Sequence, residues 1–297
     1  MSQTRDVSLG LAFGLAAAFA WGAQAVVARS GTVAGYTPLD LAALRYIAAG
    51  LVLAPFAWRA RQALAAIGLK RLVVVAIAGG AGNALLFSWG LVHAPASHGG
   101  TIAPITAAIM GAVLGIPLLR EWPTRGRVVA IGVIVLGVAL IGWDGIGGEH
   151  PGAWRGDLIL LCAGTSWAAF TLLLRRWRVP ALAGNAAVCC LSALMLVPVW
   201  LALGMGSVPG QPIGMTLLQM VAQGLIASAL ATTLYAKAGE LLGATRTACL
   251  TALVPVMAVM LSVIVLAEPL GWAKLVGVTL AVGGMLVAVI FTGRRTR

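Results

Sequence analysis

Long apolar runs separated by short polar segments occur throughout the 297-residue chain. The pattern predicts ten membrane-spanning helices, because a helix crosses the hydrocarbon layer with roughly 20 apolar residues. The predicted spans are residues 8–28, 37–57, 71–93, 98–119, 127–143, 156–174, 181–203, 215–236, 245–266 and 272–291. Continuous apolar runs differ from the alternating segments of a membrane β-barrel. The expected fold is therefore an all-α integral membrane protein.

The ten spans form two halves of five that share landmark residues at a nearly constant offset. Trp21 and Arg29 recur 146 positions later as Trp167 and Arg175. Three further pairs follow at offsets of 145 to 147, namely Glu121 and Glu268, Gly132 and Gly277, and Gly137 and Gly283. Because five is an odd number, the second half enters the membrane in the opposite orientation. The pattern predicts a 5+5 inverted-topology repeat, which is the plan of many secondary transporters.

The repeat predicts one membrane-embedded unit with two parts. Residues 1–146 form the first five-helix repeat and residues 147–297 form the second, inverted one. The prolines of the fourth and ninth spans break this symmetry, because Pro104 lies seventeen residues before Glu121 whereas Pro255 lies thirteen before Glu268. Proline interrupts the hydrogen-bond ladder of a helix. These two spans are therefore expected to bend differently.

The formal net charge of +12 reflects topology, because the basic residues cluster on one side of the predicted spans. Sixteen basic residues fall on the side of the N-terminus and three on the other. The sixteen are Arg5, Arg59, Arg61, Lys70, Arg71, Arg120, Arg125, Arg127, Arg175, Arg176, Arg178, Lys237, Arg246, Arg294, Arg295 and Arg297, and the three are Arg29, Arg155 and Lys274. Lys and Arg mark the cytoplasmic face, so both termini are predicted to be cytoplasmic. No nucleic-acid partner is expected, because the basic residues form no stripe of the kind that tracks phosphates.

Composition supports the membrane assignment and suggests its source. Hydrophobic residues make up 61% of the chain and charged residues 9%, which is far from a soluble domain. Arginine exceeds lysine and alanine is abundant, as in GC-rich bacterial genomes, so the expected location is a bacterial inner membrane. The lipid bilayer and a small-molecule substrate are the expected partners, and the sequence does not specify an oligomeric state.

Four side chains near the predicted midplane are candidates for a substrate site. Trp21 and Trp167 lie roughly 20 Å and 18 Å into their spans from opposite sides, away from the interfacial belts where membrane tryptophans gather. Each could form an aromatic wall against substrate or pack between helices. Gln24, one turn after Trp21, and Asn83 in the third span could contact substrate or bond a neighbouring helix.

Three basic side chains are candidates for a gating or charge role. Arg45 lies about seven residues inside the second span, where a cation is costly and often functional. It could hold a substrate carboxylate or extend outward toward Asp40. His93 and His98 flank a short outer turn, and we expect them to be solvated loop residues, with gating or proton sensing as the alternative.

The acidic residues are not expected at the midplane. All eight map to loops or span ends, at Asp6, Asp40, Glu121, Asp144, Glu149, Asp157, Glu240 and Glu268. Without a buried acid to hold a proton, facilitated transport is the expected mode. Sugar-phosphate carriage would need several buried cations, and only Arg45 qualifies. An intramembrane enzyme is the alternative from another class, but the chain has three histidines and no HExxH or GxSG pattern. Neither a metal nor a cofactor is expected.

Three features of the chain occur together in one known family. They are the Trp in the first helix of each half, Pro38-Leu39-Asp40 followed by Arg45, and a Glu before a Gly-rich helix at each half's last junction. In these features the whole chain resembles the EamA-type permeases of the drug/metabolite transporter superfamily. It implies that helices 1, 3, 4, 6, 8 and 9 surround a central cavity while helices 5 and 10 lie to one side. Trp89 and Tyr235 then become substrate-binding candidates, because they lie on helices 3 and 8.

The resemblance implies a secondary transporter that exports small metabolites. Amino acids and related zwitterionic or uncharged compounds are the expected substrates, carried by alternating access around a midplane cavity. A proton-coupled drug exporter is the alternative within the same class. Small proton-driven relatives keep a carboxylate in the middle of helix 1, and the first span here has none.

Overall fold

The computed structural model describes residues 2–120, 122, 124–147 and 150–293, and all of its regular elements in these ranges are helical. The α-helices are α1 (Ser2–Val33), α2 (Pro38–Arg59), α3 (Arg61–Ile67), α4 (Leu69–Ala76), α5 (Gly82–His93), α6 (Ala96–Leu119), α7 (Arg125–Gly147), α8 (Trp154–Arg176), α9 (Ala181–Ala202), α10 (Ile213–Gln219), α11 (Ala231–Leu242), α12 (Ala244–Thr251), α13 (Val254–Leu266) and α14 (Trp272–Gly293). Two π-helical segments, η1 (Ile77–Ala81) and η3 (Met220–Leu230), and a short 3₁₀ turn, η2 (Val208–Gly210), complete the set.

Eight of the described helices or continuous helical runs are long and apolar enough to cross a membrane. Two more apolar helical segments, Val128–Trp143 and Trp272–Val287, are shorter than the 18 residues required of a candidate span. Each of the ten predicted spans thus corresponds to a helical run, but the number of crossings stays a prediction for these two. The short helix α3 lies in the gap between the second and third predicted spans, where no element is predicted.

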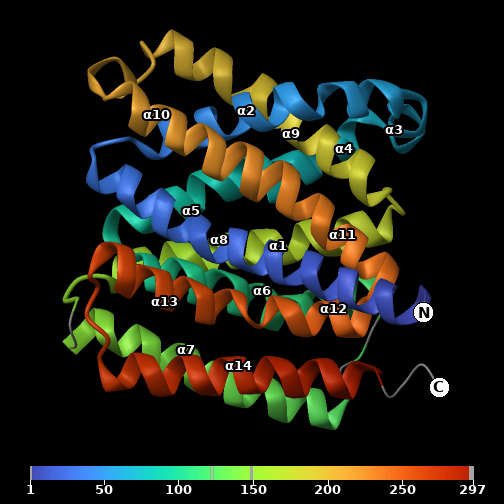
Figure 1. Cartoon of the computed structure of the whole chain (residues 1–297), viewed down its shortest axis with the longest axis vertical. Helices are drawn as coiled ribbons and strands as arrows, with labels where there is room; N and C mark the ends of the chain where they lie inside the picture. Colours follow the sequence, from blue (N-terminus) through green and yellow to red (C-terminus); the bar gives the residue numbers. More distant parts are fainter. Residues whose placement is uncertain (1, 121, 123, 148–149, 294–297) are drawn as a thin grey trace.

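The helices run side by side across the bundle in three tiers (Figure 1). The pair α7 and α14 lies along one edge, and α2, α3, α4, α9 and α10 lie toward the opposite edge. Between them lie α1, α5, α6, α8, α11, α12 and α13. This arrangement agrees with the expectation that helices 5 and 10 lie to one side. The start of α1, the helix α3 and the end of α14 all lie at the same end of the bundle.

Small residues allow the close helix contacts on which this packing depends. At Gly137 of α7, an added Cβ would lie 2.6 Å from the Gly277 carbonyl oxygen of α14. At Gly164 of α8, it would lie 2.4 Å from the Ala103 carbonyl oxygen of α6. In a membrane, such contacts bring backbones together and supply dispersion energy. The large apolar cluster around Ile105, Ile134 and Leu160 fills the space between these helices.

Helices four and nine differ, as the prolines predicted. The first is continuous from Ala96 to Leu119 with Pro104 and Pro117 inside it. The second is interrupted between α12 and α13, and Pro255 stands in the first turn of α13. Proline is tolerated in the first helical turn, where its missing N–H has no partner to lose. The two halves are therefore not identical here.

Candidate functional site

The third helix of each half contains a π-helical segment near its middle. In the first half, η1 follows α4, and Gly80 has non-helical backbone angles (φ −113°, ψ −111°). In the second half, η3 occupies residues 220–230, and an offset of 146 places residues 77–81 at 223–227. Because a π segment shifts backbone carbonyls out of the regular ladder, such segments often mark functional sites. Transporters place substrate sites at interruptions of this kind near the midplane.

Side chains from the second half satisfy the backbone of η1. Ser166 of α8 donates a hydrogen bond to the Ala78 carbonyl oxygen (2.7 Å). The Ser192 hydroxyl of α9 accepts from the Ala81 N–H (3.0 Å). An added Cβ at Gly80 would lie 2.1 Å from this hydroxyl oxygen, so only glycine fits. These bonds are needed because lipid offers no partner for a free backbone group.

Side chains from both halves satisfy the backbone of η3. Trp21 Nε1 of α1 donates to the Ala227 carbonyl oxygen (3.1 Å). Asn185 of α9 donates to the Ser228 carbonyl oxygen (3.0 Å). Because Asn185 and Ser192 lie two turns apart on α9, this helix contacts both π segments. The two interruptions are thus linked through one helix.

The two predicted tryptophans each pack on the third helix of the opposite half. The Trp21 ring lies 5.2 Å from the Tyr235 ring of α11, next to Ala17, Ala20 and Ala231. The Trp167 ring lies 5.0 Å from the ring of Phe170 in a cluster that includes Ala78 of η1. The structure therefore brings Trp21 and Tyr235 together and places Trp167 at the other π segment.

The remaining substrate-binding candidates are placed separately. Asn83 is buried and donates to the Ala163 carbonyl oxygen of α8 (2.7 Å). This bond to a neighbouring helix is one of the two roles predicted for Asn83. Gln24 is half-buried on α1. Trp89 is 53% exposed on α5 and belongs to neither tryptophan cluster. A substrate role for these three residues stays a prediction.

Arg45 does not extend toward Asp40, which corrects one of the two predicted arrangements. Its Nε donates to the Ser228 hydroxyl of η3 (2.7 Å), and its guanidinium lies 5.3 Å from the centre of the Tyr46 ring. The residue is 8% exposed, so it is more deeply buried than a side chain that reaches the interface. The cation therefore lies against the second π segment.

The expectation of two solvated histidines is wrong for His98 and right for His93. His93 is exposed at the end of α5. His98 is fully buried, and its Nδ1 lies 2.7 Å from Oδ1 of Asp157 on α8. Asp157 is itself buried, at 7% exposure. The premise that no acid is buried is therefore also wrong. The helix α6 covers the first turn of α8. The position of a residue along its predicted span does not reveal such coverage.

A cavity of about 370 Å³, here called the outer cavity because it lies on the predicted outer side, is found where α1, α6 and α13 end or begin. Its lining includes Arg29, His150 and Glu268. The Glu268 carboxylate accepts from the N–H groups of Ala96 (2.6 Å) and Ser97 (3.1 Å) at the start of α6. A carboxylate is stabilised at a helix N-terminus by the helix dipole. This contact ties the second half to the first at the predicted outer side.

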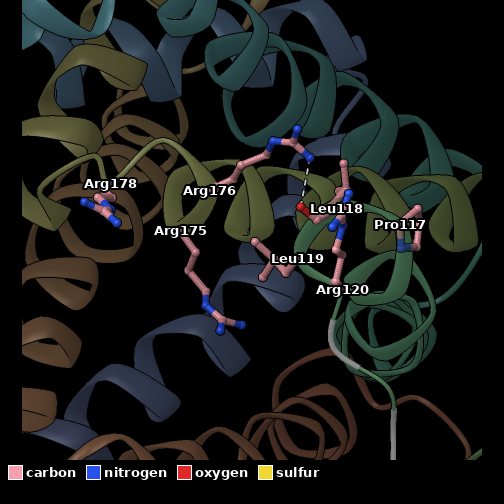
Figure 2. A pocket seen from close by; sticks show the side chains of 7 residues that line it. All are labelled: Pro117, Leu118, Leu119, Arg120, Arg175, Arg176 and Arg178. Atoms are coloured by element: carbon pink, nitrogen blue, oxygen red, sulfur yellow. Dashed lines mark hydrogen bonds between the residues drawn. The ribbon is translucent and has the colours of Figure 1, made fainter.

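A second cavity, of about 570 Å³, lies at the other ends of α6 and α8 (Figure 2). It is lined by Pro117, Leu118, Leu119, Arg120, Arg175, Arg176 and Arg178. Arg176 donates to the Leu118 carbonyl oxygen (2.8 Å), the bond drawn in Figure 2. The repeat offset of 146 aligns Arg175 here with Arg29 in the outer cavity. The two cavities thus hold equivalent residues, although Glu121, the counterpart of Glu268, lies outside the described residues.

Several residues of these sites were missed in the sequence. Ser166, Ser192 and Ser228 are small polar residues inside apolar spans, and serine is too common in membrane helices to stand out. Asp157 lies near the end of its predicted span, where acids are common, so the sequence does not distinguish it. The run Gly79-Gly80-Ala81-Gly82 was the available signal for η1, because consecutive glycines weaken a helix. No comparable signal exists for η3. Among the described residues, no group of His, Cys, Asp and Glu could hold a metal ion.

Comparison with known proteins identifies the family. The model of the EamA-like transporter family matches twice, over residues 8–143 and 154–290. The chain is 26% identical over 255 residues to the "Uncharacterized transporter YetK" of Bacillus subtilis (strain 168). The aligned region covers 83% of this chain and 77% of that protein. A solved structure described as "Crystal structure of protein" has a TM-score of 0.62 at 20% identity, with 98% of this chain and 99% of that chain covered, and shows the fold. From the two matches of its family model, this chain belongs to the EamA-like transporter family.

Proposed function

We propose that the protein exports small uncharged or zwitterionic metabolites, with amino acids as the first substrate class, by alternating access. The two π segments are the observation that supports this proposal most directly. They lie at equivalent offsets in the third helix of each half and are bonded by side chains of the other half. A substrate that contacts both segments would therefore sense the relative position of the halves.

The proposed unit consists of ten spans arranged as two inverted five-helix repeats, residues 1–146 and 147–297. The cavity lined by Glu268 and the cavity lined by Arg175 would be the outer and inner entrances. The halves rock about the midplane, so that the entrances open in turn. Trp21, Gln24, Asn83, Trp89, Trp167 and Tyr235 are the proposed substrate contacts.

Amino-acid exchange tests the proposed substrate class. Liposomes that contain the purified protein are preloaded with unlabelled L-amino acids from a panel. They are expected to take up the matching radiolabelled compounds faster than preloaded liposomes without protein. Gly80→Ala should lower this exchange about tenfold or more, because the new Cβ displaces Ser192 from η1. Gly111→Ala is the matched control, since its Cβ meets nothing within 4 Å. No uptake of any panel member, or equal activity of both variants, would contradict the proposal.

The proposed orientation places both termini and the loop around α3 in the cytoplasm of a bacterium, because of the asymmetry of Lys and Arg. Single cysteines at Gln62 and at Gly147, in a chain without its four native cysteines, are expected to react from opposite sides of the membrane. The measurement is labelling of intact cells with a membrane-impermeant maleimide, compared with labelling of broken cells. Labelling of both positions from the same side would be incompatible with the ten-span topology.

A further inference from the structure

A buried histidine–carboxylate pair joins α6 to α8 near their predicted outer ends. His98 Nδ1 lies 2.7 Å from Asp157 Oδ1, and neither residue is more than 7% exposed. The other oxygen, Asp157 Oδ2, is buried without a hydrogen-bond partner among the described residues. A buried carboxylate oxygen that lacks a partner is costly while the group is ionised. The pair is therefore not a fully satisfied structural bridge.

A residue that lines the outer cavity lies beside this pair. His150 lines that cavity, and its ring lies 6.2 Å from the ring of His98 in an edge-on arrangement. An imidazole can accept a proton on one nitrogen and release one from the other. His150 therefore lies between the cavity and the buried pair. The other titratable or charged side chains on the surrounding elements are Arg29, His93, Arg155, Glu268 and Lys274, and the side chains of Asp144 and Glu149 lie outside the described ones.

We propose that His98 and Asp157 form a proton-binding site reached from the outer side, and that its occupancy controls the opening of the outer ends of α6 and α8. The flux consequences of this inference rest on the transport function proposed above. A proton from outer water passes to His150 and then to His98, whose Nδ1–H donates to Asp157 Oδ1. On release the proton returns by the same route, so no proton crosses the membrane.

The two states of the pair differ in buried charge. With the proton bound, an imidazolium and a carboxylate form a neutral pair with a charge-assisted hydrogen bond between α6 and α8. Without the proton, a net negative charge remains between two apolar helices, and Asp157 Oδ2 has no donor within the part of the chain that the structure describes. Admission of water to the outer ends relieves this cost. Low outer pH should therefore hold the outer side closed, and high outer pH should free it.

Proton binding can be measured without any transport substrate. The chain has only three histidines, so ¹³C-labelled imidazoles of the full protein in nanodiscs can be assigned with His93→Gln and His150→Gln. We expect the His98 resonance to change between pH 5 and 9, and its pH response to change in Asp157→Asn. A His98 resonance that stays constant over this range, or that responds identically in Asp157→Asn, overturns the proton-binding site.

Exchange in liposomes tests the control of opening. With equal pH on both sides, exchange of the radiolabelled L-amino-acid panel by the wild type is expected to rise about fivefold from pH 5.5 to pH 8. In His98→Gln this rise should be lost, because the imidazole that takes up the proton is gone. In Asp157→Asn the rise should move to lower pH, because the imidazolium of His98 has lost its carboxylate partner. His93→Gln, which replaces the exposed histidine, should keep the wild-type profile. A wild-type profile in both pair variants overturns the control of opening. If no panel member exchanges, the proposed substrate class fails, and the imidazole titration alone decides on the proton site.

Discussion

Substrate affinity is expected to fall about tenfold or more in Trp21→Ala and in Trp167→Ala. Loss of a large apolar contact costs on the order of 1–3 kcal/mol if the ring touches substrate, and each 1.4 kcal/mol corresponds to a tenfold change in affinity. Trp21 donates to the backbone of η3 and Trp167 packs near Ala78 of η1, so both variants should be affected. The measurement is the dissociation constant of the best amino acid of the exchange panel on purified protein.

The packing role of these rings needs a control of its own. Trp21 also donates to the Ala227 carbonyl oxygen, so its truncation lowers stability as well. Trp21→Phe loses this hydrogen bond but keeps an aromatic ring, whereas Trp272→Ala removes a ring that is 70% exposed. Affinity should survive better in Trp21→Phe than in Trp21→Ala and should not change in Trp272→Ala. Lower stability with unchanged affinity would remove both tryptophans from the substrate site.

Asp40→Ala is expected to lower the free energy of unfolding by on the order of 3–5 kcal/mol. The carboxylate is fully buried and accepts from the Thr37 N–H (2.8 Å), from Trp200 Nε1 (2.8 Å) and from the Ser207 N–H and hydroxyl (3.2 and 2.9 Å). It thereby joins the first turn of α2 to the end of α9. Gly206, at φ +58°, approaches so closely that an added Cβ would lie 2.1 Å from Oδ1. The variant leaves several buried donors without an acceptor.

Unfolding of Asp40→Ala can be followed by SDS titration in mixed micelles. Asp40→Asn keeps the size of the side chain and one acceptor oxygen, so it should lose less stability. Glu240→Ala removes an acid from an exposed pair with Lys237 on α11, and such pairs contribute little. A loss in Asp40→Ala no larger than that in Glu240→Ala would show that the Asp40 hydrogen bonds do not stabilise the fold.

Helix positions were largely predictable from the sequence because hydrocarbon imposes a length on each apolar run. The interruptions within these runs were not. The backbone of η3 has no glycine cluster comparable to Gly79-Gly80, and its stability comes from Trp21 and Asn185, which are far away in the chain. Asp157 illustrates the same limit. Its position near a span end was correct, but its burial depends on the covering helix α6, and local sequence does not encode which helix covers which.

The hydrogen bonds at the π segments have a consequence for the independence of the two halves. Ser166 and Ser192 of the second half bond η1, while Trp21 and Arg45 of the first half bond η3. A half produced alone would leave polar groups of its own third helix without partners in lipid. Two separate chains, divided between residues 143 and 154, should therefore assemble into an active complex when produced together, and each alone should be degraded. Within such a pair, one chain would serve as an obligatory folding partner of the other.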